Sequence, residues 1–179
     1  MTQDSDAVRT DWAKVDPAEH VRRSAETYRV VKAMEDALAT DPPEAWDKSF
    51  HPDFTWRGNA GSGVKPDFPS FLRNWVQPLH AAFDDWSFTT ERFIADGDWA
   101  ACTGVLDATH VGPFMGIEAT GARVRIRYFD IWHVRDGRIA DNPVFVDLAS
   151  VMQQLGRDPF AGEGWEAFDR GEKEPPKRG

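Results

Sequence analysis

The fold is decided by residues 122–147, which read ARVRIRYFDIWHVRDGRIADNPVFVD. Over the first half of this stretch apolar and polar residues alternate, which is the pattern of a β-strand with one buried and one exposed face. Asp136-Gly137 then interrupts the alternation. Because a type I′ turn needs positive φ at both central residues, this dipeptide favours a two-residue hairpin turn. The stretch therefore predicts an antiparallel hairpin with strands at about 122–134 and 138–147.

The pattern continues toward the N-terminus, where Asp96-Gly97 marks a second turn between strands at about 87–95 and 98–111. Before Trp86 the apolar spacing is helical rather than alternating. In the N-terminal half we expect a helix from Pro17 to about 40 with a capping box at Asp16 and Glu19, a short helix over 46–50, an extended segment over 54–58, and a helix over 67–83 kinked or divided at Pro78. After the last strand we expect a helix with Asp147 as its N-cap that ends at Gly156.

Helices followed by a meander of strands predict an α+β fold, in which a curved antiparallel sheet is covered on one side by the N-terminal helices and encloses a pocket. A chain of 179 residues fits one domain. We place this domain at residues 16–156. Residues 1–15 are expected to be a flexible tail, and residues 157–179 a C-terminal extension whose charged end is disordered.

Composition excludes several classes of function. The formal net charge of −9 is opposite to that of a protein that binds a phosphate backbone. No apolar run is long enough for a membrane span, and the N-terminus lacks the apolar core of a signal peptide. The single Cys102 excludes an internal disulfide, and no metal-binding or phosphate-binding motif occurs. We expect a cytoplasmic protein that uses no metal or cofactor and binds neither nucleic acid nor membranes.

One carboxylate lies on the apolar face of the central strand. That face carries Val124, Ile126, Tyr128, Asp130, Trp132 and Val134, and the opposite face carries Arg123, Arg125, Arg127, Phe129, Ile131 and His133. An unpaired buried carboxylate costs several kcal/mol, and its desolvation raises its pKa toward neutrality, as a general acid or base requires. Asp130 is therefore the candidate catalytic residue. The alternative is a structural aspartate bonded to backbone or to a tyrosine hydroxyl.

His110 is the candidate partner of Asp130, on a face of the preceding strand that is otherwise made of small and apolar residues. A hairpin tip at residues 119–121 places His110 opposite Asp130, and a tip one residue earlier places it opposite Tyr128. A loose loop over 112–121 separates the pair. Candidates for the pocket wall are Trp56, Trp75, Phe114, Met115, Tyr128, Trp132 and Phe145, each of which is also compatible with ordinary core packing.

The run from Thr109 to Ile117, followed by Ala119-Thr120-Gly121 and by residues 130–139, resembles the SnoaL-like polyketide cyclases of the nuclear transport factor 2-like superfamily. The resemblance extends over about residues 71–156. It implies a cone-shaped fold and a cofactor-free enzyme that closes a ring by intramolecular aldol condensation of a small apolar or polyketide-like substrate. The family's inward aspartate, a general acid/base, then corresponds to Asp130 and its helper histidine to His110.

Other functions remain open at this point. A ketosteroid-isomerase-like isomerase or dehydratase needs the same inward acid. An epoxide hydrolase of this fold needs inward arginines, whereas the arginines here fall on the face opposite Asp130. A non-catalytic binding or dimerisation module predicts a filled cavity. The sheet face that the helices leave uncovered predicts a homodimer.

Overall fold

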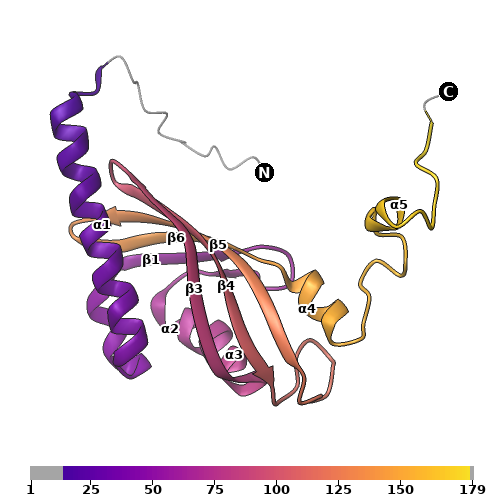
Figure 1. Cartoon of the computed structure of the whole chain (residues 1–179). Coiled ribbons are helices and arrows are strands. Elements are labelled where there is room, and N and C mark those ends of the chain that lie inside the picture. The colour runs from indigo at the N-terminus through magenta and orange to yellow at the C-terminus, as the bar shows by residue number, and fades with distance from the viewer. Residues whose placement is uncertain (1–13, 178–179) are drawn as a thin grey trace, which may run out of the picture.

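The computed structural model describes residues 14–177, so residues 1–13 of the expected tail and residues 178–179 lie outside the described part (Figure 1). In chain order the elements are α1 (Pro17–Thr40), the 3₁₀ helix η2 (Pro43–Ser49), β1 (Phe50–Gly58), β2 (Val64–Lys65), α2 (Phe68–Phe71), the π-helical segment η3 (Leu72–Val76), α3 (Gln77–Ala82), β3 (Phe83–Asp96), β4 (Trp99–His110), β5 (Arg123–Arg135), β6 (Arg138–Val146), α4 (Leu148–Gln154) and α5 (Glu166–Asp169).

The strands form one six-stranded sheet in the order β2-β1-β6-β5-β4-β3. From β3 to β6 the sheet is the predicted antiparallel meander. At its other end β1 joins β6 in parallel, a contact between distant parts of the chain that the local pattern does not contain. The predicted α+β class and curved sheet are confirmed. Among residues 14–177, no helix has the length and apolar character needed to cross a bilayer.

Helix α1 lies along one side of the sheet, and α2 and α3 lie near its lower edge in Figure 1. The predicted N-cap is present, since the Asp16 carboxylate accepts a hydrogen bond from the Ala18 amide at 3.0 Å. Glu19 instead accepts from the Arg22 guanidinium, so the reciprocal half of the capping box is not formed. Val31 and Met34 are buried on the helix face that packs toward the sheet.

The single helix predicted over residues 67–83 is divided into α2, η3 and α3. Pro78 follows the π-helical segment directly and has no amide hydrogen for a helical hydrogen bond, although the backbone stays helical across the junction at Val76 and Gln77. The π-helical segment precedes it and takes up the change in helical geometry. This division places Trp75 and Leu79 on the wall of the cavity described below.

Both hairpins are confirmed, with one turn shifted by a residue. Asp136 and Gly137 have φ of 51° and 69°, as the predicted type I′ turn requires. The first turn is centred on Gly97-Asp98 rather than Asp96-Gly97, because β3 continues through Asp96. Gly97 then holds positive φ at the first central position, which is typical of a type II′ turn.

Beyond α4 the chain leaves the sheet, and the C-terminal segment that carries α5 extends away from the body (Figure 1). Trp165 in this segment is exposed, and its ring centroid lies 6.1 Å from that of Phe168. The short helix α5 was not predicted from the sequence.

Candidate active site

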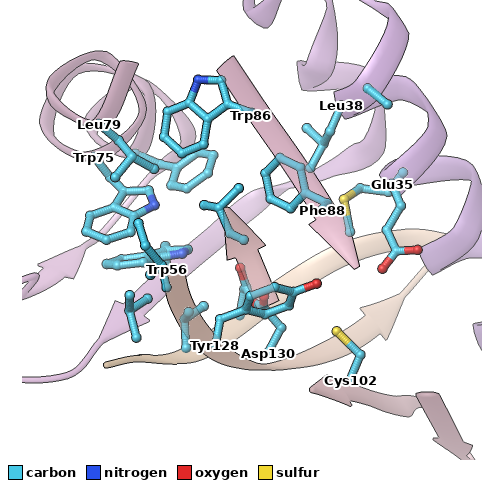
Figure 2. A pocket seen from close by; sticks show the side chains of 18 of the residues that line it. Glu35, Leu38, Trp56, Trp75, Leu79, Trp86, Phe88, Cys102, Tyr128 and Asp130 are labelled. Carbon is cyan, nitrogen blue, oxygen red and sulfur yellow. The ribbon is translucent and has the colours of Figure 1, made fainter. Parts of the chain in front are cut away.

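A cavity of about 760 Å³ lies between α1, the η3–α3 segment and the inner face of the sheet. This volume is within the range of small-molecule sites, which is roughly 300–1,000 Å³. Its wall is mostly aromatic and aliphatic, and Figure 2 shows Trp56, Trp75, Trp86 and Phe88 around it. From β4, Cys102 and Leu106 line the cavity.

Asp130 enters this cavity from the middle of β5. The predicted faces of β5 are confirmed, since Val124, Ile126, Trp132 and Val134 on the side of Asp130 are buried. The amide nitrogen of Asn142 on β6 donates to Asp130 Oδ1 at 3.1 Å and to the Ile131 carbonyl oxygen at 2.8 Å. The same amide group thus fixes both the side chain and the adjacent backbone, which leaves Oδ2 as the oxygen without a protein donor in the described structure.

Burial raises the pKa of Asp130 to about 6. The hydrogen bond from Asn142 acts in the opposite direction, and the negative charge of Glu35 adds to the increase. Desolvation dominates because the surrounding wall offers the carboxylate few donors and no close cation. Near neutral pH, Asp130 is therefore able to gain and release a proton with little change in free energy.

Tyr128 lies two residues before Asp130 on the same face and also lines the cavity. Its hydroxyl oxygen is 3.4 Å from Thr90 Oγ1, a weak hydrogen bond. Burial raises the pKa of the phenol, so it remains protonated at neutral pH and can donate a hydrogen bond. The Asp130 carboxylate and the Tyr128 phenol thus lie side by side on one strand (Figure 2).

His110 does not pair with Asp130. The register places Cys102 opposite Asp130, and Cys102 lies eight positions before His110 along β4, a separation of about 26 Å in a strand. The reason is the connection between β4 and β5, where Phe114 and Ile117 form a small turn of their own. Thr109 therefore pairs with Arg123, as expected from the third alternative above, in which residues 112–121 form a loop and separate His110 from Asp130.

His110 instead anchors this connection. The Thr120 amide donates to His110 Nδ1 at 3.3 Å, and the ring is fully buried with its centroid 5.4 Å from that of Phe83. The Thr120 hydroxyl oxygen also lies close to the ring, 3.0 Å from Nδ1. Nε2 has no hydrogen-bond partner among the described residues.

The cavity brings together most of the predicted wall. Trp56, Trp75, Phe114, Tyr128 and Trp132 line it. Met115 and Phe145 do not belong to this wall: Met115 lies in the exposed turn of the β4–β5 connection, and Phe145 is exposed on the opposite face of the sheet. Phe145 follows the alternation of β6, in which Val144 and Val146 point inward.

The residue pattern does not identify six polar residues of the cavity wall: Lys32, Glu35, Asp36, His80, Thr90 and Asn142. Glu35 had a recognisable signal, since it lies four residues after Val31 and so falls on the sheet-facing stripe of α1. No local pattern marks Asn142, because its contact with Asp130 depends on the pairing of β6 with β5. Asp147 has the predicted role of N-cap, accepting from the Ser150 amide at 2.9 Å.

No set of three or more His, Cys, Asp or Glu side chains within residues 14–177 is arranged to hold a metal ion. Cys102 is buried beside Asp130, and burial together with the nearby carboxylates raises the pKa of its thiol to about 12. The thiol is therefore not a nucleophile at neutral pH.

The sequence of the chain is similar to those of known proteins. The profile of the SnoaL-like polyketide cyclases matches residues 28–155. The nogalonic acid methyl ester cyclase of Streptomyces nogalater is 29% identical over 136 residues, which are 74% of this chain and 98% of that enzyme.

Solved structures show the same fold. A SnoaL-like protein of Jannaschia sp. CCS1 superposes with a TM-score of 0.68 at 19% identity, over 81% of this chain and 98% of that one. A nuclear transport factor 2-like protein of Burkholderia thailandensis gives a TM-score of 0.61 at 22% identity, over 72% and 96% of the two chains. The chain thus belongs to the SnoaL-like polyketide cyclase family.

Proposed function

We propose that this protein is an acid/base enzyme that closes a ring by intramolecular aldol condensation of a polyketide-like ester, with Asp130 as the base. The observation that carries the proposal is the Asp130 carboxylate, which enters a large aromatic cavity from the sheet and whose pKa burial raises to about 6. The similarity to a methyl ester cyclase supports the choice of substrate class.

The reaction would proceed in two proton transfers. Asp130 removes a proton from a carbon adjacent to a carbonyl, and Tyr128 donates a hydrogen bond to the developing enolate oxygen. The enolate carbon then attacks a second carbonyl carbon of the same molecule, which forms the ring and leaves an alkoxide. Asp130 returns its proton to the alkoxide. The sequence is redox-neutral, and one carboxyl group acts as base and then as acid.

Two alternatives are less well supported. A non-catalytic module would have a filled cavity and a backbone-bonded Asp130, whereas here the cavity is open and the carboxylate is held by the Asn142 side chain. An isomerase or dehydratase would use the same base. The aldol reaction is preferred because methyl ester cyclases are among the relatives, including the aklanonic acid methyl ester cyclase of Streptomyces peucetius, at 25% identity over 76% of this chain and 94% of that enzyme.

The test is conversion of nogalonic and aklanonic acid methyl esters by the purified protein and by Asp130→Asn. We expect the variant to lose at least about 100-fold in kcat, since general base catalysis contributes roughly 10²–10⁴-fold. Asp107→Asn is the matched control, because Asp107 is paired with Arg125 on the other face of the sheet. Full activity of Asp130→Asn would refute the role of this residue, and failure of the wild type to cyclise either ester would refute the substrate class.

A further inference from the structure

A charged pair on α1 forms part of the cavity wall. Lys32 Nζ and Glu35 Oε2 are 2.5 Å apart, and both residues line the cavity that contains Asp130. The Glu35 side chain is 22% exposed, against 42% for Lys32, so the carboxylate is the more buried member. An exposed pair of this spacing on a helix is ordinary, but this pair lies at the boundary between solvent and the proposed site.

The position of Glu35 on α1 directs its charge inward. Val31 and Met34 are buried against the sheet, and Leu38 lines the cavity one turn further on. Glu35 shares this stripe, where the helical pattern otherwise places apolar residues. Figure 2 shows its carboxylate directed toward the side of the cavity that holds Tyr128 and Cys102.

The other groups that surround Asp130 are mostly uncharged at neutral pH. They come from each element of the wall, and the titratable or polar ones are Lys32, Glu35 and Asp36 on α1, His80 on α3, Thr90 on β3, Cys102 on β4, Tyr128 on β5 and Asn142 on β6. Burial raises the pKa values of Asp130, Cys102 and Tyr128, and in all three cases the charge of Glu35 adds to the increase. Within residues 14–177, Glu35 is the charged residue that raises the pKa of Asp130 in this way.

We propose that Glu35 is a positioning residue that holds the catalytic proton on Asp130, and that Lys32 limits this effect by neutralising part of the Glu35 charge. The proposal rests on the proposed function in treating Asp130 as the base. A base that also returns its proton works best when both of its protonation states are populated. The pair on α1 adjusts this balance without touching the reacting atoms.

The experiment is a direct titration of the Asp130 carboxyl carbon by ¹³C NMR, in the wild type and in two variants, with no ligand added. Glu35→Gln removes a nearby negative charge, so the Asp130 midpoint is expected to fall by roughly 0.5 pH units. Lys32→Gln leaves the Glu35 charge unbalanced, so the midpoint is expected to rise by a similar amount. The opposite signs separate a charge effect from a loss of packing, which would not reverse between the two variants.

Glu26→Gln is the matched control. Glu26 lies on the same helix, but it is exposed and its carboxylate is 3.7 Å from the Arg22 guanidinium rather than on the cavity wall. Its removal is expected to leave the Asp130 midpoint unchanged, and Asp130→Asn identifies the signal. Unchanged midpoints in both Glu35→Gln and Lys32→Gln, or shifts of the same sign, would overturn the proposal.

The two proposals fail separately. The titration needs no substrate, so its outcome stands even if the methyl esters are not converted. If the esters are converted, the acid limb of the kcat/KM profile is expected to move to lower pH in Glu35→Gln and to higher pH in Lys32→Gln, because the deprotonated form of Asp130 is the base. An acid limb that stays fixed while the NMR midpoint moves would show that Asp130 is not the base that the limb reports.

Discussion

At the scale of single residues, Asp130 combines a favourable position for chemistry with an unfavourable one for folding. Its carboxylate shares a face with buried apolar side chains, and only one donor, the Asn142 amide, compensates for the lost water. A native protein tolerates such a group when its function needs it. Because the buried charged form is unfavourable, the free energy of unfolding depends on pH.

The direction of this pH dependence follows from the direction of the pKa shift. The pKa of Asp130 rises from 3.8 to about 6, so between these values the folded state binds more protons than the unfolded state. The contribution of Asp130 is therefore most favourable below pH ~4 and is lost as the pH rises through ~6. At 1.36 kcal/mol per unit, the loss is about 3 kcal/mol.

Asp130→Asn removes this dependence, since an amide stays neutral at every pH. We expect the variant and the wild type to have similar free energies of unfolding at pH 4, and the variant to be more stable by about 2–3 kcal/mol above pH 7. Urea unfolding of both proteins from pH 4 to 8 measures the difference, in which the other titrating groups cancel. Parallel curves would contradict the buried position of the carboxylate.

At the scale of elements, the pairing of β4 with β5 gives Tyr128 its place. Gly104 is opposite Tyr128, and a Cβ atom at Gly104 would lie 2.4 Å from the Tyr128 hydroxyl oxygen and 2.5 Å from the Thr89 carbonyl oxygen. The tyrosine can lie over β4 only because this residue has no side chain. The glycine is needed for close approach rather than for an unusual φ.

Gly104→Ala is expected to lower the free energy of unfolding by about 1–3 kcal/mol, because the added methyl group must displace Tyr128 or the backbone of β3. Catalysis should fall as well, since the phenol moves away from Asp130. Thr103→Ala, at the adjacent position on the outer face, is the control and should change stability by less than about 0.5 kcal/mol. Thermal unfolding and ester turnover measure the two effects, and a Gly104→Ala protein indistinguishable from Thr103→Ala would contradict this contact.

At the scale of the whole molecule, the outer face of the sheet carries large apolar side chains that nothing in the described chain covers. Phe129 and Phe145 are 38% and 55% exposed, and their ring centroids are 6.4 Å apart. Trp99, also exposed, stacks on His133 with centroids 4.5 Å apart. Grouped exposed aromatics are typical of protein interfaces. The predicted homodimer would bury this face.

Phe145→Lys places a charge in the middle of the face and is expected to convert a dimer to a monomer, as judged by light scattering after size-exclusion chromatography. Trp165→Ser is the control, because Trp165 is even more exposed than Phe145 but lies on the C-terminal segment. This variant should remain a dimer. A monomeric wild type would refute the dimer, and a monomer produced by Trp165→Ser alone would move the interface to that segment.

Local patterns account for what the sequence predicts well. Alternation assigns the two faces of β5, Asp136-Gly137 forms the expected turn, and Asp16 and Asp147 cap their helices. Each of these features depends on residues only a few positions apart. The inward direction of Asp130 also depends on its near neighbours alone, and the sequence therefore predicts it.

The residue pattern alone predicts the four strands of the meander, the two faces of β5 and the carboxylate on its apolar face, because side-chain direction repeats every two residues whatever the strand pairs with. It does not predict β2 or the start of β1 at Phe50. Only the tertiary structure decided which residues meet Asp130. The β4–β5 connection sets the register that brings Cys102 rather than His110 opposite it, and β6 and α1 bring Asn142 and Glu35. These contacts join segments far apart in the chain, so their geometry depends on loop conformation and helix packing, which residue periodicity does not encode.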